Sequence, residues 1–293
     1  MKSFFADLKA AIDSAGLSTH IQPSDQTISA IVARIAVTHG AVVAQNVRSY
    51  LDAVLSTYTW DEILEFFETR GSNPFDGITT RREEEDNFDD LNGTTTSYVY
   101  EQVELPEIVS GERGIECGRY HPSPVKSVRL ALDKLQGHGV RFRDFCFVDV
   151  GSGLGRNLLI ASHYPFKKII GIEISEYLNR VAVHNIQQYQ SKHGISNRIE
   201  TQCIDALHYD FPDENLILYF WETFGKRSSE EFCRKVEQCV SSSKKKMILM
   251  FLGKSFNEIH TSCRFKLIEA FKTHDNTLSS DTYFDVSMFE VVG

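Results

Sequence analysis

Apolar positions in the first 70 residues recur every three or four residues, which is the spacing of amphipathic helices. The stripes are Phe4, Leu8 and Ile12; Ile28, Ile31, Val32 and Ile35; and Val43, Val47, Leu51, Val54 and Leu55. A further helix is predicted over 59–71, because Thr59 and Glu62 have capping-box spacing and Gly71 is a typical helix end. We therefore expect about four helices before the pattern changes.

Residues 71–118 are polar, acidic and glycine-bearing, so we expect a long irregular connection there. Connections of this length are usually functional lids or disordered. Its acidic part, RREEEDNFDD (81–90), indicates a solvated loop more readily than an acidic recognition patch. A helix should then follow Ser123, the expected N-cap, with Pro124 at its first position and Gly137 at its end.

From residue 145 onward, apolar strand-like runs alternate with helical patterns. We expect strands at 145–150, 167–174, 198–205, 215–220 and 246–253, and helices at 154–163, 176–190 and 229–240. Strands that are apolar without alternation are typical of a parallel sheet covered by helices on both faces. Two last runs, 264–274 and 282–292, have no helix between them, so they should pair antiparallel at the end of the sheet.

Composition agrees with a globular protein: 42% of the 293 residues are hydrophobic and 24% are charged. No run approaches the roughly 18 apolar residues of a membrane span. Charges at Lys2, Asp7, Lys9 and Asp13 do not fit a signal peptide, so a cytoplasmic protein is expected. Six cysteines without a C-x-x-C pair indicate reduced thiols, and no metal site is expected.

Negative charge is concentrated in the first part of the chain. Residues 1–100 hold 7 Lys and Arg against 15 Asp and Glu, whereas residues 101–293 hold 24 against 25. Affinity for nucleic acid rests on clustered Lys and Arg. The acidic balance therefore argues against a nucleic-acid partner.

Three glycines follow the first predicted strand, in FVDVGSGLGR at 147–156. A glycine-rich turn at the carboxyl end of a strand lies where open α/β sheets bind ligands. The dinucleotide fingerprint G-x-G-x-x-G would need glycine at 156, where this chain has Arg156, and no Gly-Lys-Ser/Thr of a P-loop follows. Gly151 and Gly153 remove Cβ atoms that would keep a ligand away from the backbone.

A carboxylate stands at the end of each of three successive predicted strands. Asp149 is placed to meet a cationic amine, Glu173 to accept both hydroxyls of a ribose, and Asp205 to accept from the exocyclic amine of adenine. A single acidic residue at a strand end is often only a turn or cap residue. Together with G-x-G-x-G, the set suits an adenosine that bears an amino-acid tail.

In these motifs residues 119–293 resemble the class I S-adenosylmethionine-dependent methyltransferases. FVDVGSGLGR is similar to their first motif, GIEIS to the second, and IDAL contains the acidic residue of the third. The segment YHPSP (120–124) resembles Tyr-x-Pro-Thr-Pro of one group of these enzymes. The resemblance implies an α/β fold with a seven-stranded Rossmann-like sheet, an antiparallel C-terminal hairpin and an N-terminal helical extension.

The resemblance also implies roles for single residues, with S-adenosyl-L-methionine as the cofactor. Those that would face its methionine portion are Asp149, Gly151, Gly153 and Gly155. Glu173 would hold the ribose, and Asp205 with the adjacent Ala206 the adenine. Tyr120 and Ser123 would approach from the side of a lid.

After the fourth strand the chain departs from the family pattern. Methyltransferases acting on amines often carry Asn/Asp-Pro-Pro-aromatic here, and the nearer group an Asn-Pro-Phe form, whereas this chain has WETF. Glu222 takes the Asn/Asp position and would act as a general base or hold an ammonium. Trp221 is the aromatic residue that we expect near the sulfonium. Among His121, His163 and His208, His121 is the preferred candidate base because it follows Tyr120.

Several hypotheses fit, with residues 1–118 as a helical lid with an acidic loop and 119–293 as the catalytic domain. The first is methylation of a small molecule enclosed by that lid. The second is methylation of a protein recruited by the acidic segment. The third is a cyclase, in which the amine of the substrate displaces methylthioadenosine and closes a four-membered ring. A binding-only protein with a relic site is the fourth. The acceptor and the oligomeric state stay open.

Overall fold

The structure is a computed structural model. It describes residues 4–15, 23–55, 59–61, 63, 87–100, 105, 120–195, 198–241, 245–274 and 283–293. The chain forms two compact units, one of Met1–Thr80 and Val99–Tyr120 and the other of Arg81–Tyr98 and His121–Gly293. The predicted domain boundary at residue 118 stays a prediction. The compact units divide the chain differently, because Arg81–Tyr98 belongs with the residues after 120.

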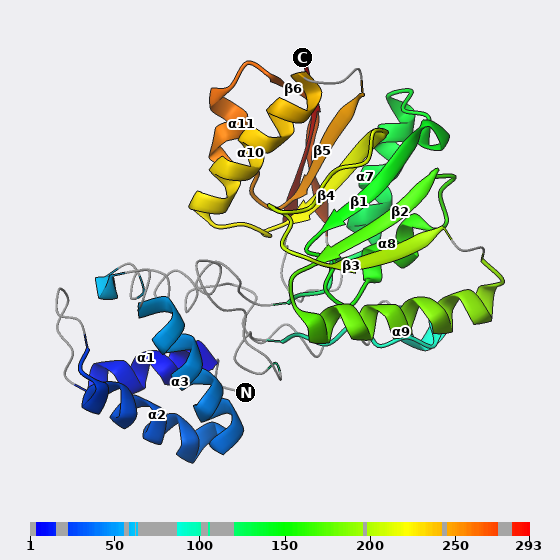
Figure 1. Ribbon diagram of the computed structural model, residues 1–293. Coiled ribbons are helices and arrows are strands. Elements are labelled where there is room, and N and C mark those ends of the chain that lie inside the picture. The colour runs from blue at the N-terminus through cyan, green and yellow to red at the C-terminus, as the bar shows by residue number, and fades with distance from the viewer. Residues whose placement is uncertain are drawn as a thin grey trace. The chain divides into compact units, whose positions relative to one another are not determined.

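Among its described residues, the N-terminal unit forms the helices drawn in blue in Figure 1. They are α1 (Phe4–Ser14), α2 (Asp25–His39) and α3 (Ala41–Leu55). The expected apolar stripes meet in one core, which includes Leu8, Ile12, Ile31, Ile35, Val47 and Leu51. Of the helix predicted over 59–71, the described part contributes Trp60 and Ile63 to the same core. The remainder of that prediction lies outside the described residues.

The second unit is built on a seven-stranded mixed sheet. Its strands are β1 (Phe145–Val150), β2 (Lys168–Glu173), β3 (Ile199–Cys203), β4 (Asn215–Trp221), β5 (Met247–Leu252), β6 (Phe265–His274) and β7 (Tyr283–Val291). The order is β3-β2-β1-β4-β5-β7-β6. The first five strands are parallel, and β7 pairs antiparallel with both β5 and β6. The predicted parallel sheet with a C-terminal antiparallel hairpin is confirmed.

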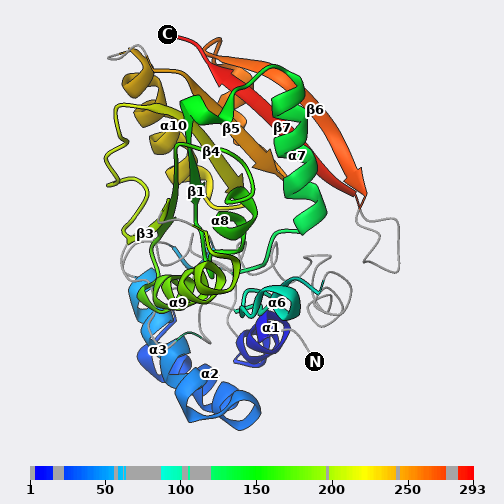
Figure 2. The same ribbon diagram turned by 90° about the vertical axis from the view of Figure 1, so that its right-hand side faces the viewer.

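Helices cover both faces of this sheet (Figures 1 and 2). One face is covered by α7 (Val125–Gly137) and α8 (Arg156–Ala161), with α9 (Glu176–His193) beside β2 and β3. The other face is covered by α10 (Lys226–Ser241) and α11 (Asn257–Thr261). A 3-10 helix, Phe142–Asp144, precedes β1, and the short helix α6 (Phe88–Asn92) packs near α9. Helices on both sides explain why the central strands are apolar without alternation.

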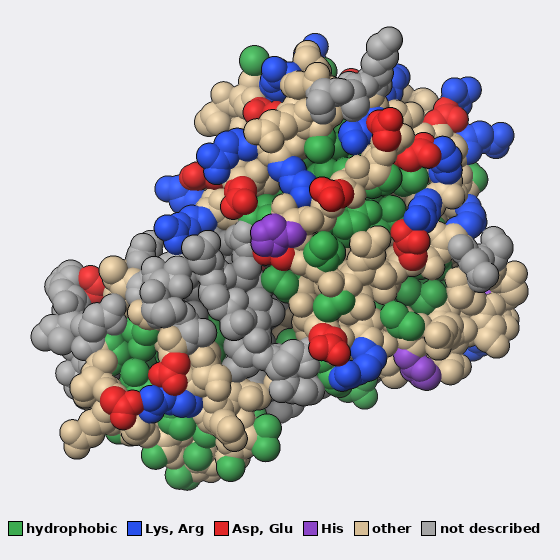
Figure 3. Space-filling model, viewed as in Figure 1, with side chains coloured by type: hydrophobic (Ala, Val, Ile, Leu, Met, Phe, Trp, Pro, Cys, Tyr) green, Lys and Arg blue, Asp and Glu red, His purple; other side chains and the backbone are tan. Residues whose placement is uncertain are grey.

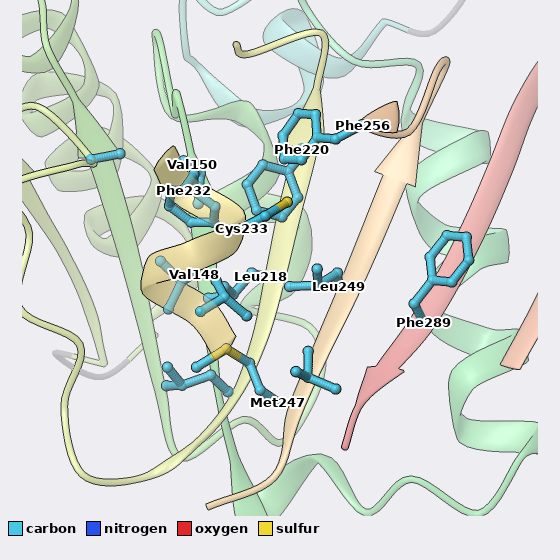
Figure 4. Close-up of a cluster of buried hydrophobic side chains, with 14 of the residues drawn as sticks. Val148, Val150, Leu218, Phe220, Phe232, Cys233, Met247, Leu249, Phe256 and Phe289 are labelled. Carbon is cyan, nitrogen blue, oxygen red and sulfur yellow. The ribbon is translucent and has the colours of Figure 1, made fainter. Parts of the chain in front are cut away.

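Alternate residues of each central strand face opposite layers. Val148 and Val150 of β1 belong to the core under α10, together with Phe232 of that helix, as Figure 4 shows. Phe147 faces the other layer, where its ring lies 6.3 Å from that of Tyr219. Asp149 lies between Val148 and Val150, so its side chain shares the face of Phe147, because strand side chains alternate.

Two predicted helix starts are wrong. Ser123 is not the N-cap of α7, because the N-cap is Pro124 and the helix begins at Val125. The helix predicted to begin after Ser228 begins earlier, at Lys226. Ser175, in contrast, caps α9 by accepting the N–H of Leu178.

No helix in the described ranges is long and apolar enough to cross a membrane. On the face shown in Figure 3, basic and acidic side chains are interspersed over the α/β unit. Of the acidic run 81–90, residues 81–86 lie outside the described part. Asp89 is buried, so the prediction of a solvated loop over 81–90 is wrong at this residue.

Candidate functional site

The carboxyl ends of β1, β2, β3 and β4 lie along one edge of the sheet. The strand order reverses between β1 and β4, because β2 and β3 extend to one side of β1 and β4 to the other. Open α/β sheets bind ligands at such a switch point. The glycine loop after β1 and the WETF turn after β4 therefore stand side by side at the expected ligand edge.

The glycine loop, residues 151–155, needs a backbone that other residues adopt with difficulty. Gly151, Gly153 and Gly155 have φ of 83°, 51° and 87°, all in the left-handed region. The N–H groups of Gly151 and Ser152 donate to the carbonyl of Ile172 at 2.8 and 3.0 Å. The loop is thus tied to the end of β2, the next strand of the candidate site.

Two of these glycines are also required by neighbouring protein atoms. A Cβ on Gly151 would lie 2.9 Å from Cγ2 of Thr223, and one on Gly155 would lie 3.2 Å from Cβ of Ala182. Such approaches are closer than side chains normally tolerate. Close packing therefore accounts for Gly151 and Gly155 independently of any ligand, which the sequence reasoning did not foresee.

Glu173 ends β2 and is buried. Its Oε2 accepts the N–H of Gly153 and its Oε1 accepts the N–H of Ser175, each at 2.8 Å. Burial raises the pKa of Glu173 although these N–H groups favour the charged form. The carboxylate consequently organises the glycine loop as well as standing at the position expected for a ribose contact.

Asp149 is almost completely buried under α8. Its Oδ2 and the Oδ1 of Asn157 have no hydrogen-bond partner within the described part of the chain. Burial raises the pKa of Asp149 well above its usual value; a hydrogen bond with Asn157 opposes this shift, and the charge of Glu173 adds to it. A buried carboxyl with an unused acceptor atom is costly, so a proton or a cationic group fits this position.

Ser123, next to Asp149 through Asn157, is the centre of a buried polar group. Its Oγ accepts the hydroxyl of Tyr219 at 2.9 Å and the side-chain amide of Asn157 at 3.1 Å. Burial raises the pKa of Tyr219 well above its usual value, so this hydroxyl is a donor and stays neutral. Ser123 therefore connects the segment before α7 to α8 and β4, and its predicted contact with a cofactor stays a prediction.

Asp205 follows β3 by two residues and forms a turn. Its Oδ1 accepts the N–H of Leu207 at 2.9 Å, and Nδ1 of His208 lies 3.9 Å from its Oδ2. Ala206 is buried next to it. Both residues stand at the predicted edge, and their predicted adenine contact remains to be tested.

Trp221, at the end of β4, is half-buried between two other rings. Its ring centroid lies 4.9 Å from that of His121 and 5.9 Å from that of Phe284, both in edge-to-face geometry. The structure thus brings together two of the predicted catalytic residues, Trp221 and His121. Such T-shaped pairs are the favourable arrangement of aromatic rings.

Glu222 has φ of 48°, a conformation uncommon for residues other than glycine and costly for the backbone. Its side chain is exposed. Its Oε1 and Cδ1 of Trp221 lie 3.4 and 3.7 Å from the point where Gly253 would carry a Cβ. The carboxylate and the indole consequently lie beside one another over the glycine that follows β5.

Tyr120, the remaining predicted catalytic residue, belongs to the N-terminal unit. Its N–H donates to the carbonyl of Tyr100 at 2.8 Å and its carbonyl accepts the N–H of Tyr100 at 3.2 Å. His163, one of the two other histidines considered as a base, instead contacts the hydroxyl of Tyr189 at 2.5 Å. Catalytic roles for these residues stay predictions.

The sequence did not point to three residues that support the site through hydrogen bonds. They are Asn157, Tyr219 through its hydroxyl, and Thr223. Asn157 occurs within the first turn of a short helix, where an amide on an otherwise apolar face was a usable signal. Thr223 stands at the position of the first proline in the family pattern Asn/Asp-Pro-Pro-aromatic, and its Oγ1 donates to the carbonyl of Val150 at 2.8 Å. That contact depends on the adjacency of β1 and β4, which no local pattern encodes.

Neither a protein-family model nor a curated protein matches the chain. Among solved structures it is similar to an RNA methyltransferase from Salinibacter ruber in complex with S-adenosyl-L-homocysteine, at 17% identity and TM-score 0.41, over 58% of this chain and 93% of that one. It is similar to magnesium protoporphyrin IX methyltransferase from Synechocystis with bound cofactor, at 16% identity and TM-score 0.41, over 57% and 79%.

A further similar structure is the precorrin 8W decarboxylase of Methanobacterium thermoautotrophicum, at 12% identity and TM-score 0.39, over 59% and 93% of the two chains. Structural neighbours at this low identity include S-adenosylmethionine-dependent methyltransferases. The α/β unit has the Rossmann-like fold predicted from the sequence, an assignment that rests on its own strand order and pairing. A fold by itself does not determine a reaction.

Proposed function

We propose that this protein is an S-adenosylmethionine-dependent methyltransferase that acts on a small molecule. One observation carries the proposal: the glycine loop 151–155, Glu173 and Asp205 follow three adjacent parallel strands at the same edge of the sheet. This arrangement suits a ligand that combines an amino-acid tail, a ribose and an adenine.

The residues present fit this cofactor. Glu173 would accept ribose hydroxyls, Asp205 would accept from the adenine amine, and the unused Oδ2 of Asp149 supports a cationic group near the glycine loop. When bound, S-adenosylmethionine supplies a methyl group attached to a positively charged sulfur. The chain would then align the acceptor and exclude water, which can lower a barrier by several kcal/mol.

Trp221 and Glu222 are the residues that we assign to the acceptor side. An aromatic face near a positive charge contributes about 0.5–2 kcal/mol. The carboxylate of Glu222, exposed beside that indole, would hold an amine and accept its proton. The proximity of both groups to Gly253 supports this pairing. An amine-bearing metabolite is the acceptor class that these side chains favour, and nucleic acid is not expected.

The cyclase remains the second candidate, favoured by the same departure at WETF. Glu222 or Tyr120 would then orient the amine of the substrate itself, and no external acceptor would be needed. Methylation of a protein is the remaining alternative. Neither changes the predicted cofactor residues.

Incubation of the purified protein with S-adenosylmethionine, followed by mass spectrometry, separates these functions. Methylthioadenosine formed without an acceptor would identify the cyclase and contradict methyl transfer. S-adenosylhomocysteine formed after addition of a deproteinised metabolite extract would support small-molecule methylation. Product formed on addition of the protein fraction would support the protein substrate instead. Glu222→Gln should reduce turnover at least about tenfold while leaving cofactor affinity unchanged.

A further inference from the structure

Arg156, which replaces the glycine of a dinucleotide fingerprint, is buried and directed at a segment about 60 residues earlier in the chain. Its Nε donates to Oγ1 of Thr96 at 2.8 Å and its guanidinium donates to Oγ of Ser97. Its Cζ lies 5.1 Å from the ring centroid of Phe88. A buried guanidinium is tolerated when its donors are used in this way.

Asp89 gives this segment a defined shape. Its Oδ1 accepts the hydroxyls of Thr94 and Thr96, and its Oδ2 accepts the N–H groups of Thr96 and Ser97, all at 2.7 Å. These hydrogen bonds and the nearby Arg156, at 4.0 Å, keep the pKa of Asp89 below its usual value despite burial. The carboxylate is therefore charged, and each of its oxygens accepts two hydrogen bonds.

Asn185 of α9 joins the segment to the glycine loop. Its Oδ1 accepts the N–H and the hydroxyl of Thr95 at 2.9 and 3.1 Å. Its Nδ2 donates to the carbonyl of Thr95 at 3.2 Å and to the carbonyl of Leu154, inside the loop, at 3.0 Å. One side chain thus links residue 95 to residue 154, and Figure 2 shows α6 of this segment beside α9.

The glycine loop gains conformational definition from these contacts. Three glycines in five residues lose much backbone entropy when they adopt one conformation. Contacts from Arg156 at the end of the loop and from Asn185 at Leu154 hold that conformation before a ligand arrives. Ordering a loop in advance increases affinity because binding no longer carries that cost.

We propose that residues 87–98, the clasp segment, hold the glycine loop in its ligand-binding conformation. Asp89, Arg156 and Asn185 are then positioning residues for the cofactor, an inference that rests on the proposed function. Loosening the clasp should weaken cofactor binding without changing the chemical step at saturating cofactor.

Variants of the clasp test this inference. Asp89→Asn and Asn185→Ala should each raise the dissociation constant of S-adenosylhomocysteine, measured by calorimetry, about tenfold or more. Arg156→Lys keeps the charge but loses the forked donors, so it should raise this constant less than Arg156→Met does. Glu214→Gln is the control, because it removes an ion pair with Lys167 before β4, at the opposite edge of the sheet. Folded clasp variants with unchanged affinity would overturn the inference.

Hydrogen exchange of the unmodified protein keeps the inference testable if these variants fail to fold. Amides of 94–98 and 151–155 should gain protection together when S-adenosylhomocysteine is added. Protection confined to 151–155 would contradict the clasp. If the unmodified protein binds no S-adenosylhomocysteine, the proposed function fails. The role of the clasp segment in holding the loop is then tested without ligand. The amides of 151–155 should exchange faster in Arg156→Lys than in Glu214→Gln, and equal exchange rates in the two variants would reject that role.

Discussion

Thr223 occupies the space that a side chain on Gly151 would need. Its Oγ1 donates to the carbonyl of Val150 at 2.8 Å, and its Cγ2 lies 2.9 Å from the position of a Cβ on Gly151. The turn after β4 is thereby attached to the start of the glycine loop after β1. The contact between Thr223 and Gly151 therefore joins the part of the site assigned to the acceptor to the part assigned to the cofactor.

Gly151→Ala should destabilise the protein by about 2–4 kcal/mol, because φ of 83° strains alanine and the new methyl group meets Thr223. Adding Thr223→Ser should restore part of that loss, since serine keeps the hydroxyl and lacks Cγ2. Urea denaturation of the two single variants and the double variant measures this coupling. A double variant with purely additive loss would show that the contact is not the cause.

Asp149→Asn should make the protein more stable at neutral pH and have little effect near pH 4. Burial raises the pKa of Asp149 well above its usual value, so the folded state keeps a proton that the unfolded chain releases above pH ~4. Stability of the unmodified protein consequently falls as pH rises through that window, and asparagine removes this fall. Glu173 has a raised pKa of the same sign, but it is present in both proteins. Melting temperatures between pH 4 and 8 provide the test.

The same carboxyl should link cofactor binding to pH. If a cationic group of the cofactor pairs with Asp149, binding releases the proton, so affinity should increase with pH. Asp149→Asn should bind more weakly and lose this dependence. Titration calorimetry in buffers of different ionisation enthalpy counts the protons released; no proton release by the unmodified protein would argue against the pairing.

Glu222→Gly should stabilise the fold by about 0.5–1 kcal/mol while lowering turnover. Glycine adopts φ of 48° without the penalty that glutamate carries, an effect partly offset by its greater freedom in the unfolded chain. Loss of the carboxylate removes the group assigned to the amine. Chemical denaturation and steady-state turnover measure the two effects, and Glu222→Gln, which keeps the strain, separates them. A glycine variant that is both more stable and fully active would remove Glu222 from the mechanism.

Glu173→Ala should weaken binding of S-adenosylhomocysteine by about 1–3 kcal/mol, the range for lost hydrogen bonds to a charged group. It should also loosen the glycine loop, because the N–H groups of Gly153 and Ser175 lose their acceptor. Calorimetry measures the first effect and hydrogen exchange at Gly153 the second. Unchanged affinity would refute the ribose assignment even if the loop became more mobile.

Ser123→Ala should cost more stability than Tyr219→Phe. The first change leaves two buried donors, the Tyr219 hydroxyl and the Asn157 amide, without their acceptor, at about 1–3 kcal/mol each. The second removes one donor and leaves Ser123 bonded to Asn157, at about 1 kcal/mol. Comparison of the two free energies of unfolding checks the order; the reverse order would show that Ser123 is not the centre of this network.

Local sequence patterns determined the elements of this protein. The stripe that contains Ile31 and Ile35 forms a helix whose face is buried, and the apolar run of β1 forms a strand covered on both sides. The glycine loop after β1 and the acidic residue that ends β2 also lie at the carboxyl ends of adjacent strands, as the sequence predicted. Such patterns reflect the periodicity of burial, which is a property of consecutive residues.

Tertiary structure decided what each of these residues touches. The buried Asp89 appeared in the sequence as part of a solvated acidic run, yet it accepts four hydrogen bonds beside Arg156. Gly151 was explained by a ligand, yet Thr223, 72 positions later in the chain, already requires it. These partners lie far apart in sequence, and strand order with helix packing brings them together. Consecutive residues encode burial and secondary structure; the contacts that shape the site arise only when distant segments pack.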